Sequence, residues 1–164
     1  MRVLTIRGEN LASLGRPFCI DFEAEPLADA GLFAITGETG SGKSTILDAL
    51  CLALYGAYPR FAAQHQDALP DPSGVRPAIA DGGTILRRGA GSGHAEVECF
   101  DQDGLRYRAR WEARRTYGRP DGTVQGANRT LHQVDGETLI LIAHTKATVQ
   151  RAVDIQTELT FEQF

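Results

Sequence analysis

Gly31-Leu-Phe-Ala-Ile-Thr-Gly-Glu-Thr-Gly-Ser-Gly-Lys-Ser-Thr45 is the stretch of the sequence that decides the fold. Its first six residues form a short apolar run, and residues 37–45 then match the pattern G-x-x-x-x-G-K-[ST]. An apolar helical pattern follows over residues 46–55. A strand, a glycine-rich loop and a helix in this order predict a phosphate-binding loop, with a buried strand over residues 32–35.

The residue types of this loop fit the binding of a nucleoside triphosphate with Mg²⁺. Glycines let the backbone approach a ligand closely, and the amide groups and the helix N-terminus attract phosphate. Lys43 is expected to contact the β- and γ-phosphates and to be the catalytic residue of the loop. Ser44 is expected to bind Mg²⁺, and Thr45 to donate a hydrogen bond to the α-phosphate.

The composition is that of a globular chain with mixed charges. The 164 residues suffice for one domain with a core, and the net charge of −4 argues against a strongly basic nucleic-acid coat. No run is long and apolar enough to span a bilayer, and the N-terminus lacks a signal-peptide pattern. Cys19, Cys51 and Cys99 lie scattered in apolar patterns, which predicts buried free thiols of a cytoplasmic protein and no disulfide framework or zinc site.

The apolar positions of residues 46–55 surround the helix almost completely, which predicts burial at the centre of the domain. Gly56 is the expected helix stop. Upstream, strands are expected over residues 2–7 and 18–22, the second with alternating apolar positions. Two strands close together before the phosphate loop point away from a simple βαβ repeat. The expected fold class is α/β, with a mixed sheet that carries antiparallel hairpins around one central buried helix.

Two strongly alternating arms, residues 94–101 and 105–113, predict a β-hairpin. A three-residue loop at 102–104, with Gly104 left-handed, brings opposite charges together on one face and apolar groups on the other. Residues 101–104 also match the D-x-x-G of GTPases, but no later Asn-Lys-x-Asp guanine motif exists. The predicted cross-strand pairs are Glu98–Arg108, Glu96–Arg110, Val97–Ala109 and Cys99–Tyr107.

Two stretches rich in turn residues carry arginines. Residues 60–93 contain many Pro and Gly residues and predict a long, partly mobile loop, in which Ile85 and Leu86 precede Arg87 and Arg88. These two arginines are either a solvated pair or functional groups. Residues 116–129 form a second turn-rich stretch, with arginines gathered around it that are either a solvated basic face or a DNA contact. These are Arg114, Arg115, Arg119 and Arg129.

The C-terminal part predicts a hairpin and helices. A tight hairpin is expected over residues 130–142, across Asp135-Gly136. Thr145 is expected to cap a helix over residues 146–153, and residues 160–163 match a capping box that opens another helix. The chain stops at this fresh helix start, which predicts that it is a truncated piece of a longer protein.

Stretches along the whole chain resemble the SbcC family, the ATPase subunits of bacterial SbcCD nuclease complexes. This family belongs with the structural-maintenance-of-chromosomes (SMC) group of ABC-type ATPases. The phosphate loop alone is shared by many ATPases, whereas residues 31–37 combined with residues 48–55 are much more particular to the family. The remaining matching stretches are residues 4–13, 58–60, 87–89 and 159–164.

The resemblance implies that residues 1–164 are the N-terminal lobe of an ABC/SMC-type P-loop ATPase head. The loop from Asn10 to Ser13 is then expected to approach the phosphates, and some relatives carry an arginine where this chain has Ala12. Arg87 and Arg88 align with a stretch that lies against the base and sugar of the nucleotide in relatives. The residues expected to wrap the triphosphate of ATP are Thr39, Gly40, Ser41, Gly42, Lys43, Ser44 and Thr45, with Ser44 on Mg²⁺.

The resemblance also implies parts and partners outside this sequence. A coiled coil with a Cys-x-x-Cys zinc hook and a C-terminal lobe with the signature motif and the catalytic glutamate are expected. ATP is expected to join two heads and so control the access of DNA to an SbcD-like nuclease subunit, while this piece alone is inactive or very weak as an ATPase. The alternatives are a head of another SMC-like or RecN-like DNA-repair ATPase, a stand-alone P-loop phosphotransferase, and a non-enzymatic DNA-end binding module.

Overall fold

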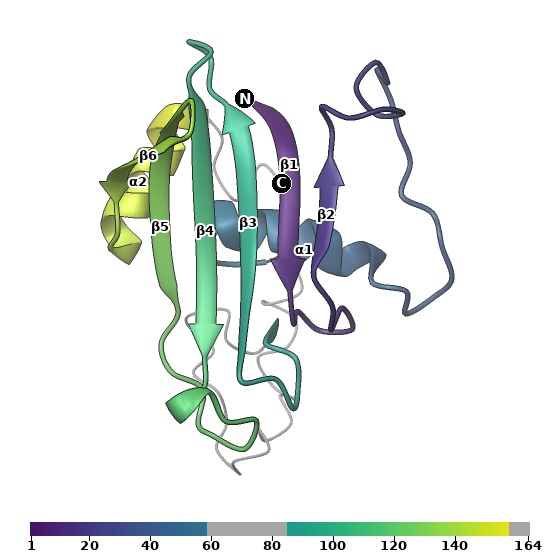
Figure 1. Cartoon of the computed structure of the whole chain (residues 1–164), viewed down its shortest axis with the longest axis vertical. Coiled ribbons are helices and arrows are strands. Elements are labelled where there is room, and N and C mark those ends of the chain that lie inside the picture. Colours follow the sequence, from purple (N-terminus) through teal and green to yellow (C-terminus); the bar gives the residue numbers. More distant parts are fainter. Residues whose placement is uncertain (59–84, 158–164) are drawn as a thin grey trace.

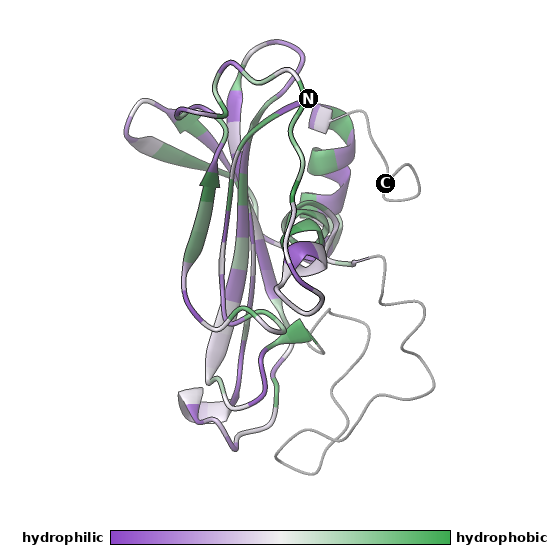
Figure 2. Ribbon diagram, turned by 90° about the vertical axis from the view of Figure 1, so that its right-hand side faces the viewer, coloured by the Kyte–Doolittle hydropathy of each residue, from purple (hydrophilic) through white to green (hydrophobic). Residues whose placement is uncertain are grey.

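A computed structural model describes residues 1–58 and 85–157 of the chain, and these residues form one sheet covered by helices. The strand order is β2-β1-β3-β4-β5-β6 (Figure 1), and both α-helices lie on the same side of the sheet (Figure 2). The strands are β1 Arg2–Glu9, β2 Phe18–Asp21, β3 Ser92–Phe100, β4 Arg106–Arg114, β5 Asn128–Asp135 and β6 Thr138–Ala143. The helices are α1 Lys43–Tyr55, the 3-10 helix η4 Thr116–Gly118 and α2 Lys146–Thr157.

Neighbouring strands of this sheet all run antiparallel. The predicted α/β class and the hairpins are confirmed, but the predicted mixed sheet is wrong for the part of the chain that the structure describes. The physical reason lies in the connections. β1–β2, β3–β4 and β5–β6 are joined directly by turns, and after α1 the chain returns to the free side of β1 in the opposite direction.

The core lies between α1 and the middle of the sheet. Ala49, Leu52 and Ala53 of α1 are fully buried, and they belong to the same cluster as Val97 of β3 and Trp111 of β4. Burying each large side chain of this kind contributes about 1.5–3 kcal/mol relative to leaving it exposed. The predicted central helix therefore exists and is fixed by the inner face of β3 and β4.

Burial of α1 extends almost all round the helix over its C-terminal half, as predicted, since the consecutive residues Cys51, Leu52, Ala53, Leu54 and Tyr55 are all buried. Nearer the N-terminal end Leu47 is the exception, because it is 53% exposed. The helix ends at Gly56, as predicted, with a left-handed φ of 70° and an amide that donates to the Leu52 carbonyl at 2.8 Å.

The predicted buried strand over residues 32–35 is wrong. These residues have no strand neighbour in the described structure, and Leu32 is 93% exposed. An apolar run becomes a buried strand only where another strand pairs with it. Phe33 instead packs on Phe22, with ring centroids 5.0 Å apart, and together with Ile35 and Leu47 these rings line an apolar groove of about 320 Å³.

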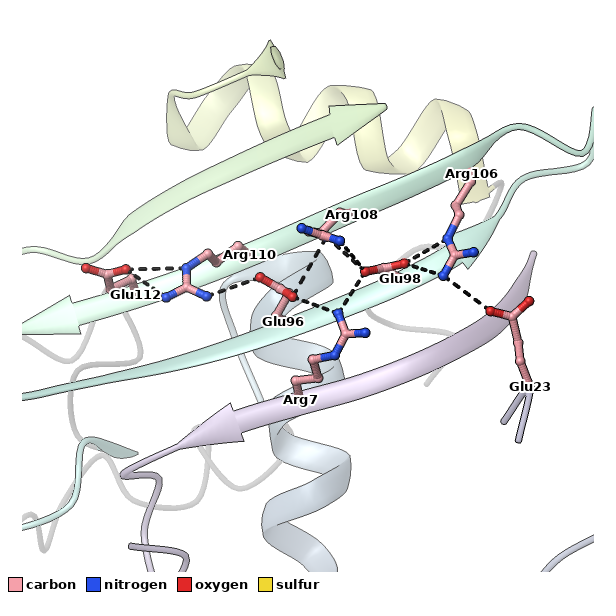
Figure 3. A network of polar contacts seen from close by, with 8 residues as sticks. All are labelled: Arg7, Glu23, Glu96, Glu98, Arg106, Arg108, Arg110 and Glu112. Atoms are coloured by element: carbon pink, nitrogen blue, oxygen red, sulfur yellow. Dashed lines mark hydrogen bonds and ion pairs between the residues drawn. The ribbon is translucent and has the colours of Figure 1, made fainter. Parts of the chain in front are cut away.

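The β3–β4 hairpin has the predicted register. Glu98 lies opposite Arg108, and Gly104 has a left-handed φ of 78°. The predicted pairs Glu96–Arg110, Val97–Ala109 and Cys99–Tyr107 are also present. On the outer face the charged residues form a continuous set of ion pairs (Figure 3). This face is therefore polar, while the inner face packs on the helices.

The second hairpin and its following helix are also confirmed. β5 and β6 pair across a turn at Gly136, which has a φ of 58°. The Thr145 hydroxyl accepts a hydrogen bond from the Thr148 amide at 3.3 Å, as an N-cap does, although α2 is longer than predicted. The predicted capping box at residues 160–163 and most of the predicted loop at 60–93 lie outside the described residues. No helix of the described part is both long and apolar enough to cross a membrane.

The cysteines differ from the prediction at one position, which gives a testable expectation. Cys51 and Cys99 are buried and free, whereas Cys19 is exposed on the edge strand β2. Burial raises the pKa of both inner thiols to about 11. We expect an aromatic disulfide reagent at pH 8 to modify one thiol quickly and the other two only after unfolding. Cys19→Ser should abolish the fast phase; fast modification of two or three thiols in the folded chain would contradict the described burial.

Candidate nucleotide-binding site

The phosphate loop runs from Gly37 into the first turn of α1. Gly42 occupies the N-cap position with a left-handed φ of 97°. This conformation favours glycine, and a Cβ atom here would also lie 2.5 Å from Cδ2 of Leu14, so that the leucine side chain would have to shift. The helix N-terminus is thereby left open to a ligand, and its amides and dipole favour an anion.

An open groove of about 540 Å³ lies in front of this helix N-terminus. One side is built by the phosphate loop and the other by Ala12 and Ser13, which come from the connection between β1 and β2. Six loop residues line the groove, namely Thr39, Gly40, Gly42, Lys43, Ser44 and Thr45. The structure thus brings most of the predicted cradle together around one concave surface.

Lys43 supplies the positive charge of the groove. Its ammonium Nζ donates to the carbonyl oxygens of Gly37 at 2.6 Å and of Glu38 at 2.7 Å. These contacts hold the charge across the mouth of the loop. Neutral carbonyls are weaker partners for an ammonium than an ionised phosphate, so the same nitrogen is well placed to exchange them for an anionic ligand.

The residues available for a metal ion are hydroxyls rather than a carboxylate cluster. Ser44 lies exposed in the groove, and Thr45 is buried behind it. Within residues 1–58 and 85–157 no group of three or more His, Cys, Asp or Glu side chains could hold a metal. The Ser44 hydroxyl is an oxygen ligand of the kind that Mg²⁺ accepts.

Asn10 and Ser13 take different positions. Asn10 turns its side-chain amide away to the Ser92 carbonyl, at 2.9 Å, so the structure gives it a role in holding the loop. Ser13 faces the groove. Asn10 and Ala12 have left-handed φ angles of 55° and 44°. Asparagine tolerates this region, whereas it is unfavourable for alanine.

Arg87 and Arg88 follow the buried pair Ile85 and Leu86 at the edge of this site. Both arginine side chains are exposed. Arg87 donates from Nη1 to the carbonyls of Ala12 at 3.1 Å and Ser13 at 2.9 Å. No pattern in the sequence points to this contact, because the two segments are 74 residues apart along the chain.

Of the four arginines in the predicted cluster at residues 114–129, two are buried and two are exposed. Arg115 is 2% exposed and donates to the carbonyls of Ala90 and Gly122, at 2.9 and 3.0 Å. Arg129 is 6% exposed and donates to the Leu54 carbonyl at the C-terminal end of α1, and burial lowers its pKa to about 10. These two are structural, so the predicted DNA contact is wrong for them. Arg114 and Arg119 are exposed.

The comparison with protein families decides between the interpretations of the phosphate loop. The family described as AAA domain matches residues 5–161. The chain belongs to this family. An AAA domain with an intact phosphate loop implies ATP binding, and the groove in front of α1 is the part of the described structure that this loop lines.

Two relatives match the AAA domain over its whole length. The SbcC subunit of the nuclease SbcCD from Rhodobacter capsulatus is 52% identical over 166 residues, which are 100% of this chain and 13% of the relative. The corresponding SbcC subunit from Pseudomonas aeruginosa is 44% identical over 164 residues, again 100% of this chain, and 14% of the relative. The predicted resemblance to SbcC is confirmed. The chain spans about one seventh of the length of these curated relatives.

A more distant relative shares only part of the AAA domain. The probable DNA double-strand break repair Rad50 ATPase of Aquifex aeolicus is 41% identical over 63 residues, which are 38% of this chain and 6% of the relative. The similarity to DNA-repair ATPases therefore extends beyond proteins named SbcC.

Proposed function

We propose that this chain is the ATP-binding N-terminal lobe of an SbcC-like ATPase head that serves a DNA-repair nuclease. The observation that carries this proposal is the groove at the N-terminus of α1, built by an intact phosphate loop in a chain that is 52% identical to an SbcC relative over its full length. Neither the loop nor the relative alone would distinguish this role from that of other P-loop proteins.

In this proposal each groove residue has one task. Lys43 moves its ammonium from the Gly37 and Glu38 carbonyls to the β- and γ-phosphates of ATP. Ser44 binds Mg²⁺, and the other residues from Thr39 to Thr45 wrap the triphosphate. Ser13 approaches the phosphates from the opposite side of the groove.

We assign the remaining parts of the reaction to segments and chains other than this one. The general base that activates water comes from a C-terminal lobe, and a second head completes the site, so that ATP joins the two heads. The exposed apolar surface at Leu32, Phe33 and Ile35 supports this assignment, because an apolar run of this kind is normally covered. Closure of the heads then controls the access of DNA to an SbcD-like nuclease subunit.

The test compares Mg²⁺-ATP binding and turnover of the chain with those of Lys43→Ala. We expect the chain to bind ATP and to show little or no turnover at any protein concentration, with turnover appearing when a C-terminal lobe is added. Lys43→Ala should weaken ATP binding about 100-fold, because it removes a charge-assisted contact worth about 2–3 kcal/mol.

Two other results would favour other functions. Robust turnover by the chain alone, lost in Lys43→Ala, would identify a stand-alone P-loop phosphotransferase and contradict the split head. DNA binding without any ATP binding would identify a DNA-end binding module. A RecN-like or other SMC-like head would share the ATP result but would not respond to an SbcD-like subunit.

A further inference from the structure

The wall of the nucleotide groove opposite the phosphate loop is held in an unfavourable backbone conformation. This wall is the 10–15 loop, which contains the groove residues Ala12 and Ser13. The left-handed φ of Ala12 persists only if surrounding groups fix it. The groups that do so come from the segment that precedes β3.

Backbone hydrogen bonds provide the first part of this support. The Ala12 amide donates to the Ile85 carbonyl at 2.7 Å, and the Arg87 amide donates to the Asn10 carbonyl at 2.9 Å. Leu11 and Leu86 thus form an isolated antiparallel bridge, and both side chains are buried. This bridge fixes the base of the 10–15 loop, whereas the carbonyls of Ala12 and Ser13 at its tip need another donor.

The Arg87 guanidinium provides the second part. Its Nη1 donates to both successive carbonyls at the tip, those of Ala12 and Ser13. The guanidinium also lies against the Cα atom of Gly15, where an added Cβ would meet Nε at 2.8 Å and Cζ at 3.1 Å. Arg87 is therefore held between the two carbonyls and Gly15, and it is not among the described residues that line the groove.

We propose that Arg87 is a positioning residue that clamps the 10–15 loop and shapes the nucleotide groove through Ala12 and Ser13, without contacting the nucleotide itself. The proposal rests on the proposed nucleotide-binding function. It differs from the direct base or sugar contact that the resemblance implied for this residue. The loop also reaches the phosphate loop, because Leu14 packs on the Cα of Gly42. Release of the clamp therefore loosens both sides of the groove.

Two substitutions release the clamp in different ways. Arg87→Gln removes the charged donor, whereas Gly15→Ala leaves Arg87 in place and pushes its guanidinium aside. Gly15 does not have a left-handed φ, so alanine fits its backbone. The matched controls are Arg88→Gln, which changes the neighbouring exposed arginine, and Gly31→Ala, where an added Cβ meets nothing within 4 Å.

The first measurement is hydrogen exchange of the full chain without nucleotide. Three amides report on the clamped loop: Leu11 and Leu14 donate to each other's carbonyls, and Ala12 donates to the Ile85 carbonyl. We expect all three to exchange about 10-fold faster in Arg87→Gln and Gly15→Ala, with no change in either control. Arg87→Lys should behave like Arg87→Gln, because the lysine ammonium ends one bond short of the Nη1 position from which arginine reaches both carbonyls. Unchanged exchange in both clamp variants would overturn the proposal.

The second measurement is the Kd for Mg²⁺-ATP of the same variants. The clamp predicts a Kd about 10-fold higher in Arg87→Gln and also in Gly15→Ala. A direct contact predicts a loss in Arg87→Gln that Lys partly restores and that Gly15→Ala does not share, and this pattern would overturn the proposal. Faster exchange with an unchanged Kd would also overturn it. If the unmodified chain bound no ATP, the proposed function would fail, while the exchange data would still decide whether the clamp exists.

Discussion

Glu98→Gln is expected to lower the free energy of unfolding by about 3 kcal/mol, because it removes the carboxylate that three arginines share. Glu98 is 1% exposed and accepts hydrogen bonds from Arg7 at 2.8 Å, from Arg106 at 2.7 Å and from Arg108 at 2.9 Å (Figure 3). Glutamine keeps the shape of the side chain but carries no negative charge. The three guanidinium groups then remain close together with less countercharge. The three arginine side chains are 28–35% exposed, so water partly solvates their charges in the variant. The expected loss of stability therefore lies at the lower end of the range for breaking a buried ion pair.

The same carboxylate predicts how stability depends on pH. Burial alone would raise the pKa of Glu98, but hydrogen bonds from Arg7, Arg106 and Arg108 outweigh it and hold the pKa below its ordinary value. A group with a lowered folded pKa stabilises the fold above its unfolded pKa of about 4.3. That contribution is lost as the pH falls through the lowered value. The unmodified chain should therefore lose more stability between pH 7 and pH 3 than Glu98→Gln does.

Denaturant unfolding at pH 7, 5 and 3 measures both effects. Glu112→Gln is the matched control, since Glu112 lies on the same face but is 43% exposed and pairs with Arg110. We expect this control to change stability by less than about 0.5 kcal/mol. Equal losses in the two variants would mean that the network acts as an ordinary exposed set of ion pairs.

The β3–β4 hairpin shows what local pattern alone can establish. Its register follows from residues close in sequence, because a period of two and a short loop with Gly104 leave one pairing that satisfies both faces. The Gly56 helix stop and the Thr145 cap were predictable for the same reason. Each is decided by chemistry within a few residues.

Most of the failed predictions depend on partners far away in the chain. Residues 32–35 have the apolar composition of a strand, but no strand of the described structure pairs with them. Arg115 and Arg129 carry charges that composition assigns to the surface, yet each is buried on backbone carbonyls of distant segments. Cys19 is exposed because it alternates with Phe18 and Ile20 and lies beside Arg7 on the outer face of the sheet, which the period of two already indicates. For residues 32–35 and for the two arginines, sequence periodicity does not contain the information.

The candidate site likewise has one part that the local sequence predicts and one part that depends on distant contacts. The phosphate loop was predictable because its motif specifies backbone conformation and charge together, and the structure gathers six of its residues on one groove. The contacts that hold the opposite wall of the groove in place could not be predicted from the sequence. Asn10 holds the loop through Ser92, and Arg87 binds the carbonyls of Ala12 and Ser13, contacts that only the folded chain creates.

Gly91→Ala is the second substitution with a large expected effect, a loss of about 3 kcal/mol or more in the free energy of unfolding. An added Cβ would lie 2.0 Å from the carbonyl oxygen of Gly118 and 2.7 Å from its carbonyl carbon. Both are backbone atoms, so no flexible side chain can move away. The Arg115 amide donates to the Gly91 carbonyl at 2.7 Å, and the Gly118 amide donates to the Arg115 carbonyl at 2.9 Å. Separating Gly91 from Gly118 therefore strains or breaks both hydrogen bonds.

Gly31→Ala is the control for the loss of a glycine, because its added Cβ meets nothing within 4 Å. It should change stability by less than about 0.5 kcal/mol. A double-mutant cycle with Arg115→Gln locates the effect, since Arg115 holds the same connection through the carbonyls of Ala90 and Gly122. Two changes that release one contact cost less together than the sum of their separate effects. Additive losses would show that Gly91 and Arg115 stabilise the β4–β5 connection independently, and unchanged stability in Gly91→Ala would show that the two backbones do not meet there.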